Sequence, residues 1–78
     1  MKIEIFGTGC AKCKKLEENV RKALEELGID AEIAKVTKIE DIIERGLMMT
    51  PGLAIDGEIR SAGRVLSAEE VKKLIQEG

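Results

Sequence analysis

Hydrophobic and polar residues alternate at the start of the chain, and the spacing then changes to that of a helix. Residues Lys2–Phe6 alternate charged and apolar side chains, which is typical of a half-buried strand. From Ala11 onward, apolar residues recur every three or four positions, and Gly28 is a suitable stop. The repeating apolar positions are Leu16, Val20, Ala23, Leu24 and Leu27. Two acid–base pairs one turn apart also favour the helix, Glu17 with Arg21 and Glu18 with Lys22.

The middle of the chain predicts a second strand and a short helix. Residues 30–36 form a strand-like run, and Thr37 with Glu40 then fits a capping box. The spacing of isoleucines after this box predicts a helix over residues 37–45, with Gly46 as its stop. Residues 47–52 are expected to form a loop.

The last third of the chain predicts a hairpin and a final helix. Asp56-Gly57 separates two short strand-like runs, residues 53–55 and 58–60, and this dipeptide suits a tight primed turn. A second capping box, Ser67 with Glu70, opens the final helix. Leu66 and Val71 are spaced to form a hydrophobic staple across its start.

These elements predict a single α/β domain spanning residues 1–78, in the order β-α-β-α-β-β-α. The first β-α-β unit should close right-handedly into a parallel pair of strands, and the hairpin should add to it antiparallel. We therefore expect a four-stranded mixed sheet with helices on both faces.

Composition narrows the function classes. The chain has 78 residues, of which 44% are hydrophobic and 36% charged, and a net charge of -2, so no polyanionic partner is implied. The sequence pattern predicts neither a signal peptide nor a membrane span. We therefore expect a cytoplasmic monomer that binds no nucleic acid and no membrane. Twelve Glu and nine Lys are a bias typical of proteins from thermophiles.

The candidate chemistry lies in Cys10-Ala11-Lys12-Cys13, which holds both cysteines of a chain that has no histidine. A phosphate cradle is disfavoured, because Lys12 stands where the third glycine of GxGxxG would be. Two thiolates could carry Cu(I) or Zn(II), so a metal carrier stays open as an alternative. A structural disulfide would not persist in a reducing cytosol, so any disulfide here should be a working one.

A redox pair is the favoured hypothesis. If Cys10 begins the long helix and Cys13 lies one turn on, their Cα atoms are about 5 Å apart, which suits an unstrained disulfide. The helix N-terminus favours the Cys10 thiolate as nucleophile, and the less exposed Cys13 would resolve the mixed disulfide. Lys12 is the candidate electrostatic tuner, whereas Lys14 and Lys15 fit a solvated helix face. No metal and no cofactor is needed for this chemistry.

The CxxC pair after the first strand, the element order and Thr50-Pro51 before the third strand resemble the thioredoxin/glutaredoxin superfamily. The whole chain is most similar to small archaeal and bacterial thioredoxin-like proteins known as redox-active disulfide proteins, which share "GTGCxxC" and "TPG". The resemblance implies a thiol-disulfide oxidoreductase that exchanges electrons with a disulfide-containing protein or a small-thiol substrate. It also implies an upstream disulfide reductase that regenerates the dithiol. A redox-silent adaptor with the same fold is a third hypothesis.

The resemblance also implies supporting residues. If the resemblance holds, the Thr50–Pro51 peptide bond is cis and the backbone of Thr50 binds an extended substrate. Two methionines beside Thr50 would then form an apolar rim. Glu4 stands at the same spacing before the first cysteine as a buried acid of thioredoxins that aids proton transfer at the resolving thiol. Strand alternation also allows an exposed glutamate at this position. Gly63 resembles a glycine that lets the backbone approach the disulfide. The Ala11-Lys12 dipeptide differs from those of thioredoxins and glutaredoxins, so no glutathione preference is carried over.

Overall fold

The computed structural model describes residues 1–9 and 11–77 of the chain. Its elements follow the predicted order of strands and helices. They are β1 (Lys2–Phe6), α1 (Ala11–Leu27), β2 (Glu32–Val36), α2 (Ile39–Glu44), β3 (Gly52–Ile55), β4 (Glu58–Ala62) and α3 (Ala68–Glu77). Among the described residues, no helix combines the length and the apolar character needed to cross a membrane.

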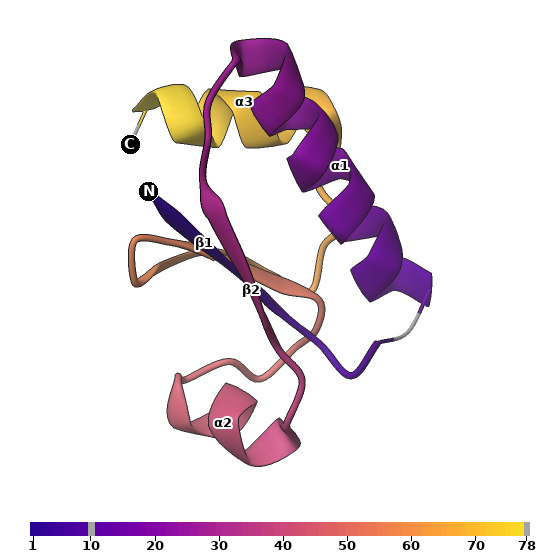
Figure 1. The fold of residues 1–78 in the computed structure, drawn as a ribbon. Helices are drawn as coiled ribbons and strands as arrows, with labels where there is room; N and C mark the ends of the chain where they lie inside the picture. The colour runs from indigo at the N-terminus through magenta and orange to yellow at the C-terminus, as the bar shows by residue number, and fades with distance from the viewer. Residues whose placement is uncertain (10, 78) are drawn as a thin grey trace.

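The strands form one mixed sheet in the order β2-β1-β3-β4. β1 pairs with β2 in parallel, and β3 pairs antiparallel with both β1 and β4. Figure 1 shows α1 and α3 on one side of this sheet and α2 on the other. The predicted four-stranded sheet with helices on both faces is therefore confirmed.

Two hydrophobic clusters hold these layers together, one on each face of the sheet. The larger cluster joins β1 to α1 and α3 and includes Ile3, Ile5 and Leu16. The smaller cluster lies under α2 and includes Phe6 and Ile42. Because side chains alternate along a strand, β1 sends Ile3 and Ile5 to the α1 face and Phe6 to the α2 face. Glu4 shares the α2 face with Phe6 by the same alternation.

Helix α1 ends where the sequence predicts. Gly28 has a φ of 67°, and its N–H donates to the Glu25 carbonyl at 3.2 Å while the Ile29 N–H donates to the Leu24 carbonyl at 3.0 Å. This pair of hydrogen bonds is a Schellman motif, in which glycine adopts the left-handed backbone without a Cβ clash. The helix then passes directly into the segment that leads to β2.

The predicted capping box at Thr37 is wrong. Helix α2 has Lys38 at its N-cap, with φ -84° and ψ 129°, and no side chain caps it. The chain is still extended at Lys38, so Thr37 stands one position too early to act as the cap. The second strand also begins later than predicted, at Glu32, because its ladder begins opposite Lys2, the first residue of β1.

In the last third of the chain, the predicted capping box and hairpin turn are confirmed. The Glu70 N–H donates to Ser67 Oγ and the Ser67 N–H donates to Glu70 Oε1, each at 3.1 Å, which is the reciprocal pattern of a capping box. Asp56 and Gly57 both have positive φ, 50° and 86°, as a type I′ turn requires. Strand β4 runs to Ala62, two residues further than predicted.

Candidate active site

Cys13 lies in the first turn of α1 with its side chain directed at the sheet. Only 5% of the residue is exposed. Its sulfur packs so closely on Gly7 that a Cβ at position 7 would overlap it. The glycine between β1 and α1 therefore serves a close approach to the sulfur, and Gly9, with a φ of 88°, makes the turn. Cys10 lies outside the described residues, and so do its predicted place at the helix start and its predicted spacing from Cys13.

The loop before β3 is tied to the end of β4. The Thr50–Pro51 peptide bond is cis, as the resemblance implies, and Pro51 is buried. The Gly63 N–H donates to the Pro51 carbonyl oxygen at 2.8 Å. Gly63 has a φ of 78°, and a Cβ there would lie 2.9 Å from Met49 Cε. Gly63 thus lets β4 approach the Pro51 loop, and the contact that it makes possible is with Met49.

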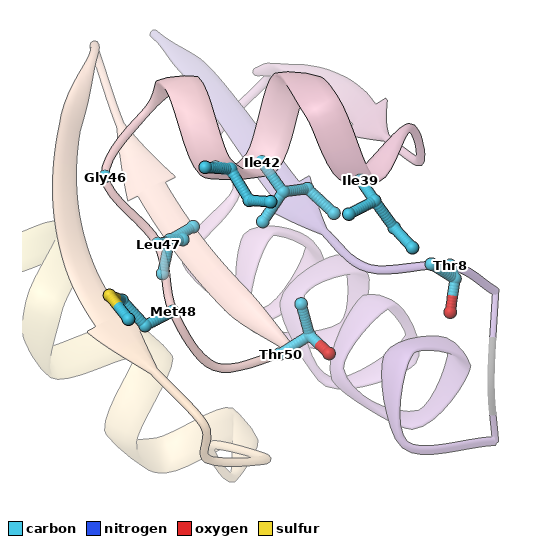
Figure 2. A pocket seen from close by; sticks show the side chains of 8 residues that line it. Thr8, Ile39, Ile42, Gly46, Leu47, Met48 and Thr50 are labelled. Atoms are coloured by element: carbon cyan, nitrogen blue, oxygen red, sulfur yellow. The ribbon is translucent and has the colours of Figure 1, made fainter.

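An apolar groove of about 540 Å³ opens beside this loop. Figure 2 shows its lining: Ile42 extends from α2 above the loop segment that carries Leu47, Met48 and Thr50, and Ile39 extends toward Thr8 at one end. Thr8 precedes Cys10 by two residues, and Thr50 directly precedes Pro51. The groove therefore runs between the two segments that the sequence singled out.

The sequence prediction missed the part that α2 plays in this groove. The spacing of Ile39, Ile42 and Ile43 predicted a helix, but it did not show that Ile39 and Ile43 are 61% and 65% exposed while Ile42 is buried. Met48 and Met49 are also exposed, at 94% and 62%, as the predicted apolar rim requires.

Glu4 is a buried acid, but the structure pairs it with an arginine on the α2 face. Arg45 Nη1 donates to Glu4 Oε2 at 2.7 Å, and Nη2 donates to Oε1 at 3.0 Å. These hydrogen bonds hold the pKa of Glu4 below its usual value and outweigh the opposing effect of burial. The guanidinium also stacks over Phe6, 5.1 Å from the ring centroid. Glu4 and Cys13 thus lie on opposite faces of the sheet and are not brought together.

Exposed lysines crowd the start of α1. Lys12, Lys14 and Lys15 are exposed, and the first turn contains no acidic residue. Lys15 Nζ lies 3.8 Å from Glu18 Oε2, so Glu18 contacts Lys15 rather than its predicted partner Lys22. A positive surface therefore lies where α1 begins, as the sequence predicts for a solvated helix face.

A metal centre finds no support in the side chains that the structure describes. Outside Cys10 and Gly78, no cluster of three or more His, Cys, Asp or Glu could hold an ion. The two-thiolate metal hypothesis involves Cys10 and therefore lies outside the described residues.

Comparisons with known proteins agree with this geometry. The family model described as "Thioredoxin domain" matches residues 1–76. A protein named thioredoxin from Methanothermobacter thermautotrophicus is 56% identical over 75 residues, which cover 96% of this chain and 97% of that protein. Another thioredoxin, from Methanocaldococcus jannaschii, is 55% identical over 71 residues, covering 91% of this chain and 81% of its own. The chain therefore belongs to the thioredoxin family of thiol-disulfide oxidoreductases.

Proposed function

We propose that Cys10 and Cys13 carry the exchange, with Cys10 as the attacking thiolate and Cys13 as the resolving thiol. The observation that carries this proposal is the burial of Cys13 against Gly7. A sulfur held there is shielded from a protein target, and attack on a neighbouring sulfur is the step that it can still perform. The proposed setting is the cytoplasm, where such a pair is kept reduced.

Each step balances in sulfur bonds and electrons. The Cys10 thiolate attacks one sulfur of the target disulfide, which forms a mixed disulfide and releases the other target sulfur as a thiolate. Cys13 then gives up its proton and attacks the Cys10 sulfur. This attack forms the Cys10–Cys13 disulfide and releases the second target thiolate. Two electrons have passed to the target, and an upstream reductase returns two.

We propose that the apolar groove receives the target chain beside its disulfide. Ile39, Ile43 and Met48 are exposed there, and clusters of exposed apolar residues mark interaction sites. Methionine adapts to varied partners because its side chain is flexible and polarisable. Thr8 and Thr50 both line the groove, so a bound chain would lie beside both the CxxC turn and the Pro51 loop. This arrangement favours a protein disulfide over a small-thiol disulfide as substrate.

Lys12, between the two cysteines, is proposed to tune the reaction by its charge. It is exposed in the first turn of α1, where its positive charge favours a nearby thiolate. Thr50 is proposed to bind the target through its backbone, and Gly63 to support the Pro51 loop from which it does so.

Trapping of the mixed disulfide tests the proposal. The Cys13→Ser variant should accumulate a covalent complex with a model protein disulfide, whereas Cys10→Ser should form none. Complexes in the Cys10→Ser variant alone would reverse the two roles. No complex in either variant, with tight retention of Cu(I) or Zn(II) against a chelator, would instead support the metal carrier. If neither variant formed a covalent complex and the protein retained no metal, the results would support the redox-silent adaptor.

A further inference from the structure

A small cavity of about 130 Å³ lies behind Cys13, between α1 and the sheet. Its charged lining consists of Lys14 and Glu17 from α1 and Lys35 from β2, with the Thr37 hydroxyl beside them. The remaining described lining residues, from β1 and the turn after it, are uncharged. Two lysines and one glutamate thus leave one net positive charge around a buried thiol.

Helix and strand geometry explain why Glu17 and Lys35 meet there. Glu17 follows Cys13 by four residues, so the two share a face of α1. Lys35 stands opposite Ile5 in the parallel ladder and shares the α1 face of the sheet with it. Lys35 Nζ lies 3.2 Å from Glu17 Oε1, so an ion pair between α1 and β2 lies at the cavity behind Cys13.

Glu17 is held in its charged form. Arg21 Nη2 donates to Glu17 Oε2 at 2.8 Å, and this bond, followed by that from Lys35, lowers the pKa of Glu17. An ionised carboxylate with two cationic partners is a poor proton acceptor. Its influence on Cys13 is therefore an influence of charge rather than of proton transfer.

Resting on the proposed role of Cys13, we propose that the Glu17–Lys35 ion pair sets the acidity of the resolving thiol. Lys35 favours the Cys13 thiolate, Glu17 opposes it, and the surplus positive charge offsets the cost of ionising a buried sulfur. The resolution rate depends on the thiolate fraction of the attacking sulfur. In this proposal the charges that act on the resolving thiol come from α1 and β2, while the acid of β1, Glu4, is paired on the other face.

The test is the ionisation midpoint of Cys13 in a Cys10→Ser background, followed by thiolate absorbance against pH. Adding Lys35→Met should raise the midpoint, and adding Glu17→Gln should lower it. Each shift should be about half a unit to one unit, less than for a direct contact, because the Lys35 side chain is 59% exposed and water screens it. Combining both substitutions should bring the midpoint back toward the background value.

Lys15→Met is the matched control, because Lys15 has the same charge as Lys35 and lies on the same helix as Cys13 but does not line the cavity. It should leave the midpoint unchanged. A Lys35→Met shift no larger than the control, or shifts of the same sign for Lys35→Met and Glu17→Gln, would overturn the proposal. A purely structural ion pair would lower the free energy of unfolding in both variants without opposite shifts.

This titration needs neither target nor reductase, so its failure is distinct from failure of the trapping experiment. In the full chain, Lys35→Met should also lengthen the life of the mixed disulfide threefold to tenfold near neutral pH, as the smaller thiolate fraction requires. An unchanged lifetime would contradict the proposal even if the midpoint moved.

Discussion

At the scale of single residues, the contact between Gly7 and Cys13 decides where the second sulfur lies. Sequence reasoning offers only that a glycine suits the turn from a strand into a helix, and the structure adds a steric reason that no pattern contains. Cys13 Sγ occupies the space that any side chain at position 7 would need. A close approach of this kind depends on how α1 crosses β1, which only the packed structure defines.

Gly7→Ala should therefore displace the Cys13 sulfur. We expect a loss of about 1–3 kcal/mol in the free energy of unfolding, which is typical of overpacking, together with slower resolution of the mixed disulfide. Gly28→Ala is the control. A Cβ at position 28 would meet nothing within 4 Å, so this substitution introduces only the backbone strain of an alanine at a φ of 67°. Equilibrium unfolding in urea and the decay of the mixed disulfide measure both effects. Wild-type values for Gly7→Ala would show that the contact has no consequence.

Glu4→Gln should lower stability at neutral pH by about 1 to 2 kcal/mol, because it removes the charged acceptor of two hydrogen bonds from Arg45. The folded pKa of Glu4 lies below its ordinary value of 4.5, so this stabilisation is complete above that value. It is lost as the pH falls through the folded pKa. The difference between variant and wild type should therefore shrink in acid. A difference that stayed constant with pH would contradict this account of the ion pair.

The same variant also tests the proton-transfer role that the family resemblance implies for Glu4. If the folded variant resolved the mixed disulfide more slowly than the wild type, the result would support that role. An unchanged rate of resolution would show that Glu4 acts only through its structural ion pair with Arg45. This comparison separates the two, because the pair with Arg45 lies on the α2 face and Cys13 on the α1 face.

At the scale of elements, the sequence predicted every helix and strand, and its errors lie at the starts of β2, α2 and β3 and at the ends of α2 and β4. Local signals were sufficient where they were complete, as in the reciprocal Ser67–Glu70 box. They failed at Thr37, because the helix begins one residue later and Lys38, which has no capping side chain, is its N-cap. The exposed face of α2 also escaped prediction, since periodicity identifies an apolar stripe without saying what covers it.

The two positions where the sequence predicted a capping box give a matched pair of variants. Ser67→Ala should cost about 1 kcal/mol of unfolding free energy, the usual cost of losing an N-cap side chain. Thr37→Ala should cost less than half of that, because no side chain caps α2. Thermal or urea unfolding of both variants provides the comparison. A larger loss at Thr37 than at Ser67 would contradict the observed helix starts.

At the scale of the whole molecule, the sheet separates two tasks. The α1 face carries most of the core and the Cys13 cavity, whereas the α2 face carries the smaller cluster and the apolar groove. Strand β1 serves both faces through its alternation. The proposed target surface can therefore vary through α2 and the residue 46–50 loop without disturbing the packing behind Cys13.

Ile43→Ser should weaken the reaction with a protein disulfide and leave the reaction with a small disulfide unchanged. Loss of one buried aliphatic contact, about 1.4 kcal/mol, corresponds to a tenfold decrease in kcat/KM for the protein target. Ile59→Ser is the control, because Ile59 is an exposed isoleucine on β4 that does not line the groove. Equal losses in the two variants, or an equal loss with the small disulfide, would argue against docking in the groove.

A redox titration of the wild-type chain tests the central claim most directly. The protein is equilibrated with defined ratios of reduced and oxidised glutathione, quenched in acid and alkylated, and its labels are counted by mass. The account predicts one two-electron transition between a species with two labels and a species with none. Its slope should be about 30 mV per tenfold change in the ratio of oxidised to reduced protein. Cysteines that remain alkylated at every ratio, or that change one at a time, would contradict it.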